Sequence, residues 1–154
     1  MLRDEINTAL KVAMKARDER RVSTLRLVNA ALKNADLEAQ GQGKPTLSDD
    51  DLLALLQKLI KQRQEAVELY EKAGRQELAT QERGEIDIIR AYLPRQLSEA
   101  ETQAVIAETI KATGAASIKD MGKVMAALKQ SYSGKMDFGN ASGLVKALLT
   151  APGA

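Results

Sequence analysis

Apolar residues recur every three or four positions along almost the whole chain, and this period is the strongest constraint on its fold. In the segment "RVSTLRLVNAALKNADLEAQ", for example, Val22, Leu25 and Val28 fall on one stripe of a helix. No stretch alternates apolar and polar residues with the β-branched and aromatic enrichment that is typical of strands. The sequence therefore predicts an all-α protein.

Glycine, proline and capping residues divide this pattern into helices. In the first part we expect about four, at residues 2–17, 22–40, 49–73 and 75–93, with the charged run "RDERR" and the loop "GQGKP" as turns. Ser48 with Asp51 reads as a capping box at the start of the longest of them, and Gly74 ends it. Pro94 ends the fourth helix because proline lacks an N–H donor and disfavours helix in the residue before it.

Three shorter helices are expected after Pro94. Ser98 with Glu101 and Ser117 with Asp120 have the spacing of capping boxes, and Asp137 reads as a lone N-cap. A chain of 154 residues can bury one core and a smaller second one. We therefore predict an N-terminal helical bundle over residues 1–94 and a small three-helix C-terminal domain over residues 95–154.

The residue types limit the chemistry that this chain can perform. It contains no Cys and no His, which removes thiol and imidazole nucleophiles, histidine bases and nearly all zinc sites. The acidic run 49–51 could bind a metal, but it lies in the first turn of a helix, where carboxylates favour the positive end of the dipole. We therefore predict no catalytic residue, no metal site and no cofactor.

Composition also bears on location. The absence of Cys fits a reducing compartment. The first ten residues include Asp4 and Glu5 and lack the apolar segment of a signal peptide, and no apolar run approaches the length of a membrane span. These features predict a soluble, cytoplasmic protein without a membrane partner.

Two Gly-Lys pairs, at 122–123 and 134–135, raise the question of phosphate binding. Neither has the upstream Gly or the following Ser or Thr of a nucleotide-binding loop. Lys119, Lys123 and Lys135 are instead expected near helix starts, where free N–H groups and a cation suit a phosphate of a nucleic-acid backbone. With one Phe and three Tyr there is no platform for base stacking. These three lysines are the predicted RNA-binding residues.

Three stretches carry a resemblance that spans nearly the whole chain: "RVSTLRLVNAALKNADLE", "EKAGRQELATQERGEIDIIRAYLPRQLSEAE" and "TGAASIKDMGKVMAALK". In order and spacing they resemble the YqeY-like proteins, the GatB/YqeY family. That family is related to the tail region of the B subunit (GatB) of the glutamine-dependent tRNA amidotransferase. The resemblance implies a helical bundle followed by a three-helix domain that contacts tRNA. It does not extend to the catalytic domain of the B subunit.

Three functional interpretations follow. The first is a non-catalytic tRNA-binding or accessory module in aminoacyl-tRNA metabolism, with tRNA, an amidotransferase or other translation-related proteins as partners. The second is a carbon-nitrogen ligase with glutamine as amido-N-donor, acting alone or as a subunit. The absence of Cys, His and any glutaminase or ATP motif argues against this enzyme. The third is a helical adaptor that binds another protein.

Overall fold

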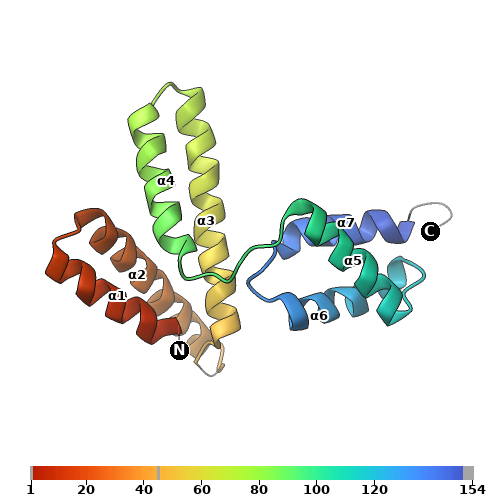
Figure 1. Cartoon of the computed structure of the whole chain (residues 1–154). Helices are drawn as coiled ribbons and strands as arrows, with labels where there is room; N and C mark the ends of the chain where they lie inside the picture. The colour runs from red at the N-terminus through yellow and green to blue at the C-terminus, as the bar shows by residue number, and fades with distance from the viewer. Residues whose placement is uncertain (1, 45, 151–154) are drawn as a thin grey trace. The chain divides into compact units, whose positions relative to one another are not determined.

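The computed structural model describes residues 2–44 and 46–150, and these residues form seven α-helices and one 3₁₀ turn, with no strand among them (Figure 1). The prediction of an all-α protein is confirmed for this part of the chain. Two compact units, residues 1–93 and 94–154, divide the chain. Pro45, the end of the predicted loop "GQGKP", lies outside the described residues.

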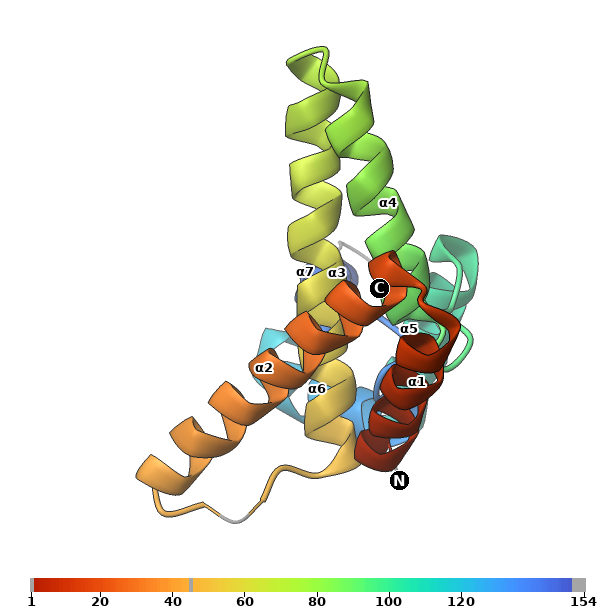
Figure 2. The ribbon, with the colours of Figure 1, turned by 90° about the vertical axis from the view of Figure 1, so that its left-hand side faces the viewer.

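The first unit consists of two helical hairpins (Figures 1 and 2). Its helices are α1 (Leu2–Ala16), α2 (Glu19–Gly41), α3 (Asp49–Lys72) and α4 (Gln76–Arg90). α3 packs along α4, α1 packs along α2, and α2 also contacts both α3 and α4. Leu25, Leu52, Leu56 and Ile89 are fully buried where these helices meet. The apolar stripes predicted from the sequence therefore face one shared core.

The turn between α1 and α2 is shorter than the sequence indicates. Only Arg17 and Asp18 of the run "RDERR" lie outside the helices, and α2 begins at Glu19. The reason is that the Asp18 carboxylate accepts the backbone N–H of Arg21 at 3.2 Å and so caps α2. Arg17 has a φ of 55°. This left-handed conformation favours glycine and costs any other residue roughly 1–2 kcal/mol.

The start and end of α3 agree with the sequence prediction. Asp51 N–H donates to Ser48 Oγ at 3.2 Å, and Ser48 N–H donates to Asp51 Oδ2 at 3.1 Å. This reciprocal pair is the predicted capping box. After α3 the chain turns at Gly74, whose φ of 73° requires little energy from a residue without a side chain.

Ion pairs connect helices of the first unit that are distant in sequence. Arg3 on α1 donates both Nη groups to the Asp36 carboxylate on α2, at 2.6 and 2.5 Å. Arg63 Nε on α3 donates to Glu85 Oε2 on α4 at 3.0 Å, and these two side chains are only 14% and 10% exposed. The Arg63–Glu85 pair is therefore part of the α3–α4 interface rather than of the surface.

Gly84 on α4 allows a close approach from α2. A Cβ atom at this position would lie 2.6 Å from Nη1 of Arg20. One turn further along α2, Thr24 is fully buried, and its Oγ1 makes no hydrogen bond. The α2–α4 crossing therefore depends on a small residue at Gly84 and on a polar side chain held among apolar neighbours.

The second unit is built from shorter helices. These are α5 (Glu99–Thr113), the 3₁₀ turn η1 (Ile118–Asp120), α6 (Met121–Tyr132) and α7 (Phe138–Thr150). Ile106, Val124, Leu128 and Val145 are fully buried and form a core of their own. Each of the three α-helices contacts the other two.

The predicted helix starts of the second unit are partly confirmed. Ser98 and Glu101 form the expected capping box, with Glu101 N–H donating to Ser98 Oγ at 3.1 Å. The segment from Ser117 forms a 3₁₀ turn before α6 begins at Met121. Gly122 nevertheless lies in the first turn of α6, as expected.

Candidate nucleic-acid interface

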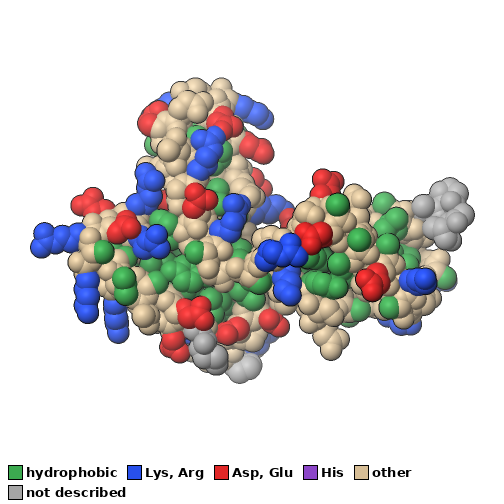
Figure 3. All heavy atoms as spheres, viewed as in Figure 1, with side chains coloured by type: hydrophobic (Ala, Val, Ile, Leu, Met, Phe, Trp, Pro, Cys, Tyr) green, Lys and Arg blue, Asp and Glu red, His purple; other side chains and the backbone are tan. Residues whose placement is uncertain are grey.

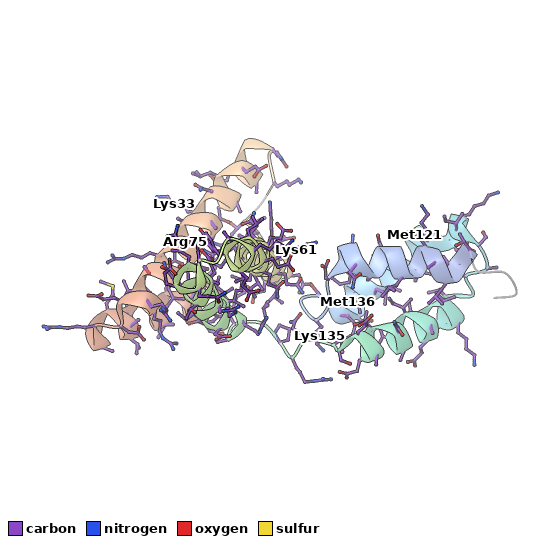
Figure 4. The ribbon with its side chains drawn as sticks, turned by 90° about the horizontal axis from the view of Figure 1, so that it is seen from above. Lys33, Lys61, Arg75, Met121, Lys135 and Met136 are labelled. Atoms are coloured by element: carbon purple, nitrogen blue, oxygen red, sulfur yellow. The ribbon has the colours of Figure 1, made fainter. Side chains whose placement is uncertain are left out.

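The three predicted RNA-binding lysines lie at two ends of one helix. Lys119 in η1 and Lys123 in the first turn of α6 are exposed, while Lys135 follows the end of α6 and is partly buried. α6 has 12 residues, so at a rise of 1.5 Å per residue it is about 18 Å long. Figure 4 shows Lys135 well separated from Met121, the first residue of α6. The structure therefore brings Lys119 and Lys123 together but not Lys135.

A carboxylate of the chain occupies the start of α6. Asp120 Oδ2 accepts the backbone N–H groups of Ala116 at 2.9 Å and of Ser117 at 3.3 Å. The hydrogen bond from Ala116, followed by that from Ser117, lowers the pKa of Asp120, and the nearby charge of Lys123 contributes to the same effect. A phosphate approaching Lys123 would therefore meet a negative charge beside it.

The turn between α6 and α7 is held firmly within the second unit. Gly134 has a φ of 75°, and its carbonyl oxygen accepts a hydrogen bond from Gln96 Nε2 at 2.6 Å. Lys135 N–H donates to Tyr132 O at 3.0 Å, and Lys135 O accepts from Leu97 N–H at 2.9 Å. The backbone of Lys135 is thus fixed on both sides, which fixes the point from which its side chain extends.

The start of α7 is also capped by the chain itself. Asp137 Oδ1 accepts the N–H groups of Gly139 at 2.9 Å and of Asn140 at 3.3 Å. The prediction that Asp137 is an N-cap is confirmed. Since these N–H groups already have a carboxylate partner, phosphate binding beside Lys135 rests on the lysine side chain.

No potential metal site is found among residues 2–44 and 46–150: no three His, Cys, Asp or Glu side chains lie together in a way that could hold an ion. The acidic run 49–51 lies at the start of α3, where Asp51 belongs to the capping box. No described helix combines the length and the apolar character needed to cross a membrane.

Sequence analysis did not identify a groove on the first unit. It is an open hollow of about 600 Å³ at the α1–α2 turn, lined by Arg17, Glu19, Val22, Ser23, Arg26 and Leu27. A sequence signal for it existed, because α2 carries apolar residues on more than one face. Leu27 is 51% exposed, although the neighbouring Leu25 and Val28 are buried.

Comparison with known proteins places the chain in a family. Residues 3–149, nearly the entire sequence, match the family described as Yqey-like protein. The chain belongs to the YqeY-like family. The resemblance inferred from the three quoted stretches is therefore confirmed, and both helical units of this YqeY-like chain fall within the match.

Curated relatives of this YqeY-like chain include fungal proteins. "Altered inheritance of mitochondria protein 41, mitochondrial" of Lachancea thermotolerans is 37% identical over 103 residues, which is 66% of this chain and 54% of that protein. An uncharacterized protein of Schizosaccharomyces pombe is 34% identical over 93 residues, 60% of this chain and 72% of that protein. The protein 41 homologue of Saccharomyces cerevisiae strain YJM789 is 33% identical over 84 residues, 54% of this chain and 44% of that protein. The chain thus spans about half the length of the protein 41 relatives that it matches.

The prediction of a cytoplasmic location is wrong, since the protein 41 relatives are named as mitochondrial. The prediction rested on the absence of Cys. A chain without Cys needs neither an oxidising nor a reducing environment, so this composition does not distinguish the cytoplasm from a mitochondrion.

Proposed function

We propose that this YqeY-like chain is a non-catalytic accessory module that contacts the phosphate backbone of a structured RNA, most directly tRNA, through its second unit. The observation that carries the proposal is the pair Lys119 and Lys123, exposed four residues apart at one end of α6. Two ammonium groups in such an arrangement can contact neighbouring phosphates without reading the bases. Lys135 supplies a separate contact beyond the other end of α6.

The two units are proposed to have different roles. In this view residues 1–94 form a separately folding helical domain, and residues 95–154 form a domain like the tail region of the amidotransferase B subunit. Asp120 and Asp137 cap helices close to the lysines, and their charges reduce the attraction for phosphate. Affinity should therefore lie in the range of non-specific binding, about 10⁻⁴ to 10⁻⁶ M, and should fall as salt rises.

Titration of labelled tRNA at several salt concentrations tests this function. The double variant Lys119→Ala/Lys123→Ala should weaken binding and flatten the salt dependence by about two phosphate contacts, and Lys135→Ala by about one. Asp120→Asn, which keeps a capping side chain, should strengthen binding because it removes the charge beside Lys123. Lys72→Ala, an exposed lysine at the end of α3 in the first unit, is the matched control.

Three results would overturn the RNA-binding proposal: no tRNA binding at low salt, an unchanged salt slope in the triple lysine variant, or an equal loss with Lys72→Ala. The alternative of a carbon-nitrogen ligase is tested separately. Incubation of the isolated protein with glutamine, ATP and Glu-tRNA should yield no Gln-tRNA. Formation of Gln-tRNA in a preparation free of amidotransferase would favour the enzyme instead.

A further inference from the structure

α2 carries apolar residues on two opposite faces. Leu25, Val28 and Leu32 point into the core of the first unit, with exposed fractions between 0% and 4%. Leu27 and Leu37 lie on the opposite side and are 51% and 56% exposed. An amphipathic helix that only covers a core needs a single apolar stripe. The second set of leucines therefore has no role in the packing of the described helices.

The side of α2 that carries Leu27 and Leu37 is also basic. We call it the outward face of α2, formed by Ser23, Arg26, Leu27, Ala30, Lys33, Asn34 and Leu37, nearly all of them exposed. Residues 20–35 contain no Asp or Glu. Lys33 extends from α2 on the side away from α3 and α4 (Figure 4). The outward face thus combines leucines with cations and has no carboxylate between Ser23 and Leu37 other than Asp36, which is paired with Arg3.

The groove at the α1–α2 turn continues this face at its N-terminal end. Val22 and Leu27 contribute apolar surface there, and Arg17 and Arg26 contribute positive charge beside Glu19. Figure 3 shows Lys and Arg side chains gathered around the same end of the first unit. Arg17 is held there in its left-handed conformation, which a glycine would adopt at lower energy. An arginine at this position is therefore not explained by the stability of the turn.

We infer that the outward face of α2 is a docking surface for an acidic amphipathic helix of a partner protein. Exposed leucines at Leu27 and Leu37 gain from burial against apolar side chains, which a phosphate backbone does not offer. Ser23, Ala30 and Leu37 follow one another at intervals of seven, the spacing with which two packed helices meet. Charge complementarity with the arginines and Lys33 selects a partner rich in carboxylates.

This inference concerns the first unit and is independent of the RNA contact proposed for the second. The probe is a synthetic amphipathic helix with Leu at positions a and d and Glu at e and g. A second peptide with Lys in place of every Glu serves as its comparison. Fluorescence anisotropy with the full chain should show saturable binding of the acidic peptide and none of the basic one.

Substitutions on the outward face should change this binding in a defined pattern. Leu27→Asp should weaken the acidic peptide by about tenfold or more, since a central apolar anchor is lost. Leu69→Asp is the matched control, because Leu69 on α3 is 67% exposed and undergoes the same change. Arg17→Gly should weaken the peptide while it raises thermal stability, so that loss of binding cannot be ascribed to unfolding.

A charge exchange completes the test. Arg26→Glu/Lys33→Glu should lose the acidic peptide and bind the basic one. The inference is overturned if both peptides bind the wild type equally, if neither binds, or if Leu69→Asp has the effect of Leu27→Asp. It is also overturned if Leu27→Asp abolishes tRNA binding or self-association of the chain instead, because the occupant would then be RNA or a second copy.

Discussion

The two units of this protein use their carboxylates in different ways. In the first unit, Asp36 and Glu85 pair with arginines on other helices, at sequence separations of 33 and 22 residues. In the second, Glu101, Asp120 and Asp137 accept backbone N–H groups no more than four residues away. Carboxylates thus connect helices in the first unit and complete helix ends in the second.

Helix length explains this difference. The first four N–H groups of any α-helix lack a partner within the helix. In α6, with 12 residues, they make up a third of all its N–H groups, whereas in α3, with 24 residues, they make up a sixth. Short helices therefore gain more from capping, and long ones from lateral contacts. This contrast can be broken or sharpened by substitutions in each unit.

The largest effect is expected from a cavity in the second core. Ile106 is fully buried, so Ile106→Ala should lower the free energy of unfolding by roughly 2–5 kcal/mol. If residues 1–94 and 95–154 fold separately, hydrogen exchange should accelerate in α5, α6 and α7 alone. Leu56→Ala in the first core is the reciprocal variant. Faster exchange in both units with either variant would mean that they unfold as one domain.

The next largest effect concerns the ion pair between α3 and α4. Arg63→Met leaves Glu85 buried without its partner, next to Glu82, whose pKa is already raised by burial and then by Glu85. We expect a loss of about 3 kcal/mol in urea denaturation, and recovery of most of it in Arg63→Met/Glu85→Met. Arg83→Met breaks a more exposed pair with Glu71 and should cost less than about 1 kcal/mol.

The opposite ranking of these two arginine variants would contradict the view that lateral ties stabilise the first unit. So would a double variant that is no more stable than Arg63→Met. Either result would indicate that α3 and α4 are held by their apolar contacts alone, as the helices of the second unit are.

The sequence predicts most of the helices because their start signals are local. Ser48, Ser98 and Asp137 each cap a helix through groups two or three residues away, so spacing alone identifies them. Asp18 was missed as a cap, since it stands in a charged run that reads as a turn. The Arg63–Glu85 pair could not be predicted, because nothing in the sequence shows which residues face each other across two helices.

The candidate sites were less predictable for a similar reason. Lys119, Lys123 and Lys135 lie close in sequence, but the length of α6 separates Lys135 from the other two. Whether N–H groups at a helix start are free depends on side-chain rotamers, and here Asp120 and Asp137 occupy several of them. The outward face of α2 requires knowledge of which of its sides the core covers.

A smaller effect is expected at the start of the second unit. Gln96 Nε2 binds Gly134 O, and Leu97 N–H binds Lys135 O, so the backbone after Arg95 is held against the α6–α7 turn. Limited proteolysis with subtilisin should therefore cut first between residues 40 and 44 and more slowly near Arg95. Gln96→Ala should speed the second cut a few-fold and leave the first unchanged.

Equal rates of both cuts in the wild type would show that these hydrogen bonds do not protect the segment. Resistance near Arg95 in both proteins, together with a single sharp melting transition, would instead show that the chain is one domain without a separable boundary.

The smallest effect concerns pH and the capping carboxylate of α5. Hydrogen bonds from Arg95 and then from Ser98 N–H lower the pKa of Glu101 from 4.5 to about 2. Because the folded state holds the proton less tightly than the unfolded one, this stabilisation is complete above pH 4.5 and is lost as the pH falls toward 2. Glu101→Gln should therefore lower the urea midpoint of the second unit at pH 6, and the gap to wild type should narrow at pH 3. The effect should be small, since Arg95 and Glu101 are 73% and 41% exposed. Glu108→Gln, an exposed site in the middle of α5, controls for the loss of one charge, and equal pH curves for both variants would show that capping by Glu101 contributes nothing of its own.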